Sequence, residues 1–158
     1  MQPTMIRALR LFAIAIALSL LAACGPPVHP INPPSATVQQ LEVLPDGRWK
    51  VQLRIEIFSD MTMHYASFKA SLSIAGSVAA DITLTPDIDI PGLNADIVET
   101  TFMPAAGASA AFAANAKQPG GAPYELKGTI LIPAADKEFK FEHKSRLSAV
   151  PGIPNQYR

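Results

Sequence analysis

The nine residues Trp49–Ile57 (WKVQLRIEI) carry the most regular pattern in the sequence, because apolar and polar residues alternate without interruption. In an extended strand, successive side chains point to opposite faces, so this alternation places one row in a core and the other in water. The apolar row consists of Trp49, Val51, Leu53, Ile55 and Ile57. The stretch therefore predicts a strand in a sheet with one buried face.

The same alternation recurs on both sides of this strand. Val38–Leu44 precedes it across Pro45-Asp46-Gly47, where proline presets φ and glycine accepts a positive φ, so the two strands should form a hairpin. Five more strands are predicted at Phe68–Ile74, Val78–Leu84, Ala95–Met103, Tyr124–Ile132 and Phe139–Leu147. In the strand that follows Gly76, we expect Val78, Ala80, Ile82 and Leu84 to face the core.

The remaining segments are short and mostly irregular. Phe58–Tyr65 and Pro86–Gly92 break the alternation and are expected to be loops, and Ala149–Arg158 is expected to be an irregular tail. The helix candidate is the alanine-rich segment Pro104–Ala116, whose single large anchor is Phe112. Seven short strands without long intervening helices predict an all-β fold, an antiparallel β-sandwich of about seven strands with one short helix at one end.

The N-terminal segment predicts export and attachment to a membrane. Arg7 and Arg10 precede the apolar run Leu11–Leu20, and small residues follow, which is the order of a secretory signal peptide. The next residues, Leu21–Cys24 (LAAC), resemble the lipobox of bacterial lipoproteins. That resemblance implies cleavage before Cys24 and acylation of the Cys24 thiol, with attachment through two or more acyl chains.

An uncleaved transmembrane helix is the alternative reading of this segment. Met5–Ala23 approaches the roughly 20 residues that a bilayer requires, although its uninterrupted apolar part is shorter. Both readings attach the chain to a membrane. Gly25 stands where an aspartate retains lipoproteins in the inner membrane of enteric bacteria, so we expect the periplasmic side of the outer membrane.

The expected organisation is therefore a signal peptide at 1–23, a lipidated cysteine with a linker at 24–36, and a sandwich domain at 37–158. The linker segment Gly25–Ala36 contains five prolines and should be an extended spacer in which His29 is solvated. Without Arg7 and Arg10, the chain carries 11 basic and 13 acidic side chains, which gives no support for nucleic-acid binding. The single cysteine is used by the lipid, so neither a disulfide nor thiol chemistry is expected.

Few residues suggest a functional site. Met61, Met63, His64 and Tyr65 form an apolar-rich loop that could bind a partner, or whose methionines could instead pack onto the core. Asp87 and Asp89 could offer oxygen ligands to Ca²⁺, but they lack the spacing of an EF-hand, and a solvated loop is the simpler reading. The three histidines share no metal-ligand spacing, and no nucleophile motif occurs. We therefore expect no catalytic residue, no metal and no cofactor.

The order of these segments resembles a known family. The strand WKVQLRIEI runs into the polar break FSDMTMHYAS. Later in the chain come the stretch IPGLNADIVETTF and an alanine-rich helix, and a late strand begins with Tyr124-Glu-Leu-Lys-Gly128. This order is similar to the second type of late embryogenesis abundant proteins, the water-stress and hypersensitive-response domain. Phe58-Ser59-Asp60-Met61 stands where that family has a break like Asn-Pro-Asn.

The resemblance implies a fibronectin type III-like sandwich without catalytic residues and a protective role in desiccation or envelope stress. A second hypothesis makes the domain an accessory subunit of an envelope secretion or assembly complex. A third, an enzyme of unknown type, would require a deep pocket with converging polar groups.

Overall fold

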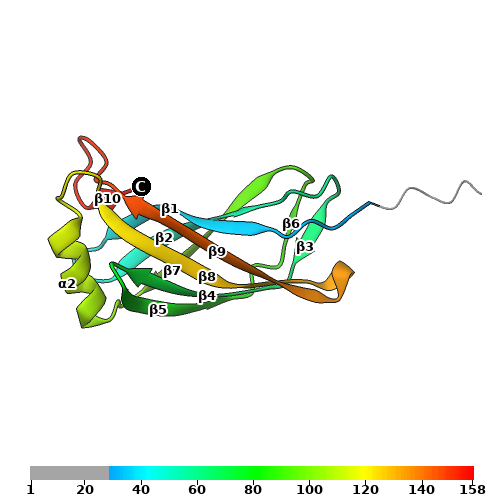
Figure 1. Ribbon diagram of the computed structural model, residues 1–158, viewed down its shortest axis with the longest axis horizontal. Coiled ribbons are helices and arrows are strands. Elements are labelled where there is room, and N and C mark those ends of the chain that lie inside the picture. Colours follow the sequence, from blue (N-terminus) through cyan, green and yellow to red (C-terminus); the bar gives the residue numbers. More distant parts are fainter. Residues whose placement is uncertain (1–28) are drawn as a thin grey trace, which may run out of the picture.

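The computed structural model describes residues 29–158, which form a β-sandwich with one α-helix (Figure 1). One sheet has the strand order β10-β1-β2-β7 and the other β5-β4-β8-β9, and every pairing is antiparallel. A two-stranded ribbon joins β3 and β6. The elements are β1 (Ser35–Val43), β2 (Trp49–Glu56), β3 (Met63–Tyr65), β4 (Ser67–Ile74), β5 (Ser77–Leu84), β6 (Ile88–Ile90), β7 (Ala95–Phe102), α2 (Ala106–Asn115), β8 (Ala122–Ile132), a 3₁₀ turn (Pro133–Ala135), β9 (Lys137–Leu147) and β10 (Gln156–Tyr157).

The predicted fold class is confirmed, and each of the seven predicted strands coincides with a strand of eight or more residues. In β2, the whole apolar row is buried, with Val51, Leu53 and Ile55 at 0% exposure, and the polar row is partly exposed. The strand β1 begins at Ser35, before the predicted Val38 and inside the segment expected to be linker, and Ala36 is fully buried. The sandwich thus includes the last residues of that segment.

The expectation for Val78 was wrong. Val78 is 54% exposed, whereas Ala79 is buried, because the register between β4 and β5 shifts at this point. Ala80 pairs with Leu72 and Val78 pairs with Ser73, which leaves Ala79 as the extra residue of a β-bulge. The bulge reverses the phase of the strand, so Val78 lies on the outer face beside Ser73.

Three short strands lie in segments that were expected to be irregular. The Phe58–Tyr65 loop contains β3, and the Pro86–Gly92 loop contains β6, which pairs with it residue by residue from Met63↔Ile90 to Tyr65↔Ile88. The C-terminal tail contains β10, which pairs with β1 through Leu41↔Tyr157. Strands of two or three residues are too short to show an alternation of apolar and polar residues. Whether they form depends on pairing with distant residues.

The helix α2 forms within the predicted segment and covers one end of the sandwich (Figure 1). Ala108 and Phe112, four residues apart and so on one face of the helix, are its buried residues. The Ala105 amide donates to the Ala79 carbonyl at 3.0 Å, which fixes the start of the helix to β5. Within residues 29–158, no helix is long and apolar enough to cross a bilayer.

The two ends of the sandwich differ in the segments that form them. At the helix end lie α2, the β1–β2 turn and the tail after β9 (Figure 1). At the linker end lie residues 29–34, the β3–β6 ribbon and its flanking loops, and the β8–β9 turn (Figure 1). The predicted signal peptide and Cys24 lie outside the described residues.

Candidate functional site

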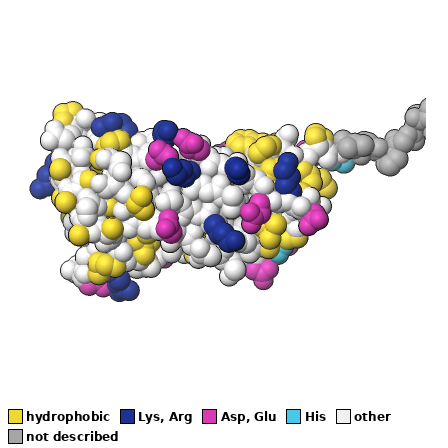
Figure 2. All heavy atoms as spheres, turned by 60° about the horizontal axis from the view of Figure 1, so that its bottom comes forward, with side chains coloured by type: hydrophobic (Ala, Val, Ile, Leu, Met, Phe, Trp, Pro, Cys, Tyr) yellow, Lys and Arg dark blue, Asp and Glu magenta, His cyan; other side chains and the backbone are white. Residues whose placement is uncertain are grey.

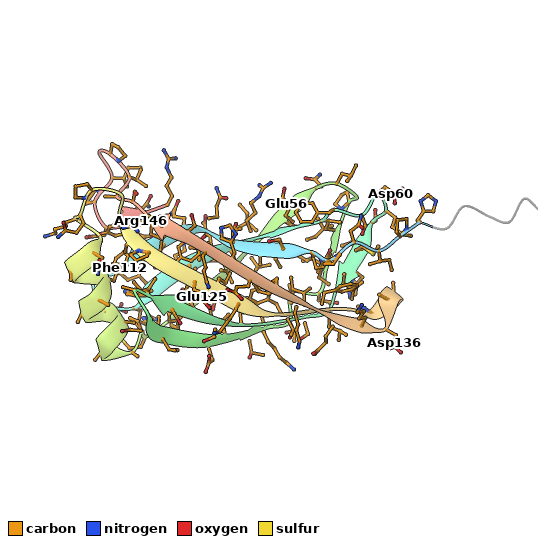
Figure 3. The ribbon with its side chains drawn as sticks, in the orientation of Figure 1. Glu56, Asp60, Phe112, Glu125, Asp136 and Arg146 are labelled. Carbon is orange, nitrogen blue, oxygen red and sulfur yellow. The ribbon has the colours of Figure 1, made fainter. Side chains whose placement is uncertain are left out.

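At the linker end, residues 29–34 lie against the loop that follows β2 instead of standing free as a spacer. The Asn32 amide donates to Ser59 Oγ at 2.9 Å, and Asn32 Nδ2 donates to the Phe58 carbonyl at 2.7 Å. His29 Nδ1 lies 2.9 Å from Asp60 Oδ2, and this hydrogen bond lowers the pKa of the Asp60 carboxyl. His29, expected to be a solvated linker residue, is therefore exposed but hydrogen-bonded to Asp60. Figure 3 labels Asp60 at the linker end.

The predicted partner-binding loop is divided between core and surface. Met63 and Tyr65 are 2% and 1% exposed, so these two residues pack into the core. Met61 is 42% exposed, and His64 is half-buried on the outer side of β3. Only Met61 and His64 of the four residues are thus available to a partner.

His64 lies between the two aspartates that were considered as calcium ligands. Its Nδ1 is 2.9 Å from Asp89 Oδ1, and its Nε2 is 3.2 Å from Asp87 Oδ1. In this arrangement, both aspartates contact the His64 ring on the exposed side of the β3–β6 ribbon. Across residues 29–158, no group of three or more His, Cys, Asp or Glu residues could hold a metal ion.

Three exposed apolar side chains gather at the linker end, and we call Phe58, Met61 and Leu93 the apolar rim. Their exposed fractions are 47%, 42% and 73%. They belong to two loops whose backbones touch, because the Leu93 amide donates to the Ser59 carbonyl at 2.8 Å. Figure 2 shows hydrophobic side chains at this end, next to the grey trace. Sequence reasoning found Met61 but missed Phe58 and Leu93, whose exposure depends on how the two loops meet.

The close contact between these loops requires glycine at position 92. A Cβ atom on Gly92 would overlap the carbonyl group of Asp60 and lie 2.7 Å from the Met61 amide nitrogen. Leu93, the next residue, has φ 55, in the left-handed region that leucine rarely occupies. The turn thus holds a large apolar side chain in solvent at a strained backbone position.

At the helix end, an aromatic-lined recess of about 320 Å³ lies between α2, the β1–β2 turn and the tail. The Phe112 ring lies 5.1 Å from the Trp49 ring and 4.7 Å, edge-on, from the Tyr157 ring. The lining residues are Val43, Gly47, Trp49, Ser109, Phe112, Ala113, Ala116, Lys117, Asn155 and Tyr157. None of these ten is a carboxylate or an imidazole, the groups that most often serve as general base.

The Tyr-x-Leu-x-Gly stretch that contributed to the family resemblance has structural roles at both of its ends. Tyr124 Oη accepts a hydrogen bond from the Val38 amide at 3.2 Å and so joins the two sheets. Burial raises the pKa of the Tyr124 hydroxyl, and the hydrogen bond from Val38 partly offsets this rise. At Gly128, a Cβ atom would overlap the Lys69 carbonyl oxygen and lie 2.7 Å from Ala70 Cα, so β4 and β8 approach too closely for any other residue.

Two other polar aromatic residues do not form a reactive site. His143 is half-buried in β9, opposite Leu126, and its ring lies 6.0 Å from the Tyr124 ring. The Tyr65 hydroxyl is buried without a hydrogen-bond partner, and burial raises the pKa of Tyr65 to about 12.

No protein-family model matches this sequence, and no curated protein matches it. Among solved structures, the chain is similar to a protein from Archaeoglobus fulgidus, with a TM-score of 0.44, 11% identity, and coverage of 73% of this chain and 94% of that one. It is also similar to AT1g01470 from Arabidopsis thaliana, solved in solution, with a TM-score of 0.47, 10% identity, and coverage of 82% and 87%. At this level of identity, neither similarity says anything about activity.

Proposed function

We propose that this chain is a lipid-anchored lipoprotein on the periplasmic side of the outer membrane. Its sandwich would act without catalysis, in the protective manner of the late embryogenesis abundant family. One observation carries the anchoring proposal: His29, paired with Asp60 at the linker end, lies only five residues after Cys24 of the lipobox. Five extended residues span at most about 18 Å. A lipid on Cys24 would therefore hold the linker end at the bilayer and leave the helix end pointing away.

The distribution of polar groups supports a role without catalysis. The helix-end recess is lined by aromatic and small side chains, and its one cation, Lys117, has no acidic partner among the lining residues. The histidine with the most charged surroundings, His64, forms ion pairs on the surface of the β3–β6 ribbon and does not face a cleft. These features suit contact with another molecule better than chemistry.

The second candidate function, an accessory subunit of an envelope complex, is favoured by the position of the recess. A recess with Trp49, Phe112 and Tyr157 on its walls could receive an apolar side chain, and aromatic residues of this kind are enriched at interfaces. It lies at the end that anchoring would direct away from the membrane. The first candidate predicts that this recess can be blocked without loss of function, and the second predicts the opposite.

Anchoring is tested by labelling cells with radioactive palmitate and comparing the wild type with Cys24→Ala. We expect label in the wild type alone, and absence of label from both would refute the lipid. Gly25→Asp keeps the acylated cysteine, so it serves as the control for location. If enteric sorting applies, this variant should move from the outer-membrane to the inner-membrane fraction while it keeps its label.

The two candidate functions are separated by blocking the recess. Ser109→Arg places a long side chain in its wall, and Lys140→Glu on β9 is the control outside the recess. If the domain is an accessory subunit, Ser109→Arg should abolish crosslinking to one envelope protein and Lys140→Glu should not. If the role is protective, a deletion strain should die faster on drying, and both variants should restore survival.

A further inference from the structure

We infer that the apolar rim of Phe58, Met61 and Leu93 inserts into the lipid surface of the membrane that holds the anchor. This inference rests on the proposed lipid at Cys24 and goes beyond it. A lipid alone tethers the domain at one point, whereas a rim in the bilayer also fixes its orientation. The linker end of the domain would then face the bilayer.

The geometry of the linker end supports this contact. Residues 29–34 are hydrogen-bonded to the same loop that carries Phe58 and Met61, through Asn32 and His29. The segment that leads to Cys24 and the apolar rim therefore lie at the same end of the sandwich. His29 is five residues after Cys24, so His29 cannot lie farther than about 18 Å from the lipidated residue.

The chemistry of the linker end favours lipid over a charged partner. The segments that carry the rim and the tether, 29–34, 57–62 and 91–94, contain no lysine or arginine, and their one acid, Asp60, lies 2.9 Å from His29. The charged residues Asp136, Lys137 and Glu138 at this end belong to the β8–β9 turn. The neighbouring Asp87 and Asp89 are paired with His64. Contact by three apolar side chains on segments without lysine or arginine should resemble the shallow burial of an interfacial anchor, about 5–10 Å deep.

The position of Leu93 points in the same direction. Glycine or asparagine would suit a residue with φ 55, but leucine stands there with 73% of its surface exposed. Strained positions of this kind are associated with functional contacts. Among the residues that the structure describes, Val78, Ile97, Met103 and Ile153 are also exposed and apolar. Ile97 lies within β7, whereas Val78 lies at the start of β5 beside the start of α2, Met103 precedes α2 and Ile153 lies in the tail, so these three provide matched controls at the helix end.

The test uses full-length, lipidated protein reconstituted into vesicles of phosphatidylethanolamine and phosphatidylglycerol with brominated acyl chains. Leu93→Trp places a fluorophore in the rim, and Met103→Trp places one at the helix end; the natural Trp49 is buried and gives a common background. We expect the vesicles to quench about half of the added emission of Leu93→Trp, since bromines quench a ring at the acyl boundary. Met103→Trp should not be quenched, and high salt should not release the quenching.

The outcomes separate the rim from the anchor. Lipidated Leu93→Trp protein that shows no quenching would overturn the rim contact and leave the anchor intact. Quenching of both Trp variants would also overturn it, because it would show that the domain lies on its side. Protein that carries no lipid on Cys24 would refute the anchor, and quenching of its Leu93→Trp form on added vesicles would still support the rim.

A second variant tests the orienting role and does not depend on an added fluorophore. The triple variant Phe58→Gln/Met61→Gln/Leu93→Asn removes the rim, and Val78→Thr/Met103→Gln/Ile153→Gln changes the matched residues. We expect the first to lose most of the residual fluorescence anisotropy of vesicle-bound Trp49, and the second to keep it. Equal anisotropy in all three proteins would overturn the proposal. If the rim variant instead loses crosslinking to an envelope protein at unchanged anisotropy, the rim binds that protein and not lipid.

Discussion

The two ends of the sandwich use apolar side chains in opposite ways. At the helix end, the rings of Trp49, Phe112 and Tyr157 pack against one another, and Phe112 is only 4% exposed. At the linker end, Phe58 and Leu93 extend into solvent from loops that are held together by backbone hydrogen bonds. The helix end also exposes Val78, Met103 and Ile153, so the difference lies in two features. The aromatic cluster stabilises the fold at the helix end, and the strained turn at Leu93 holds an apolar side chain in solvent at the linker end.

The largest expected effect is at the helix end. Phe112→Ala removes the side chain that joins α2 to Trp49 and Tyr157, and we expect a loss of about 3–5 kcal/mol in the free energy of unfolding. Leu93→Ala at the linker end should change it by less than about 0.5 kcal/mol. Urea denaturation of both variants measures the difference, and equal losses would contradict the division of roles.

Two tyrosines sharpen the comparison, because one hydroxyl is bonded and the other is not. Tyr124→Phe leaves the buried Val38 amide without its acceptor and should cost about 1–3 kcal/mol. Tyr65→Phe, toward the linker end, removes a buried hydroxyl without a partner and should raise the free energy of unfolding by about 1 kcal/mol. Thermal unfolding of the pair checks both signs, and a destabilised Tyr65→Phe would mean that its hydroxyl has a function in the fold.

A smaller effect is expected at the strained turn. Leu93→Asn places a residue that tolerates positive φ at φ 55, so we expect a gain of about 0.5–1 kcal/mol in the free energy of unfolding. Ile153→Asn, at an exposed helix-end position without positive φ, is the control and should not gain. A gain in stability together with weaker contact with lipid would show that the leucine is kept for binding, and the gain is measured by denaturant titration.

The smallest effect is the response of the linker end to acid. The pKa of Asp60 is lowered from 3.8, so the folded state binds its proton less readily than the unfolded chain. The His29–Asp60 contact therefore favours the folded state above about pH 4 and is lost as the pH falls through the lowered pKa. We expect a lower protection factor for the Asn32 amide in acid, measured by NMR hydrogen exchange and corrected for the intrinsic rate at each pH. In Asp60→Asn this dependence should disappear, and an unchanged pH profile would show that the carboxylate does not hold the segment.

The sequence predicts those parts of the fold that depend on local alternation. The eight residues of β2 alternate between apolar and polar side chains, and the β1–β2 turn joins adjacent strands, so both could be predicted from short stretches. Phe112 could be identified because it is the one large side chain in an alanine-rich helix. Each of these features needs no information from distant residues.

The features that were missed depend on contacts between distant segments. The bulge at Ala79 arises from the pairing of β5 with β4, and the short β6 exists only because β3 lies beside it. The contact of Asn32 with the loop after β2 cannot be predicted from a proline-rich stretch. The exposure of Leu93 likewise follows from the close approach that Gly92 allows.

The short strand β10 has a consequence for the order in which the molecule can fold. Because Tyr157 pairs with Leu41, the outer edge of β1 remains unpaired until the chain has been synthesised as far as residue 157. Pairings between residues so far apart form slowly, and they keep a growing chain from completing its sheet early. In the folded protein, this short strand covers the part of the β1 edge at Leu41 and Glu42, which would otherwise be open to pairing with a neighbouring molecule.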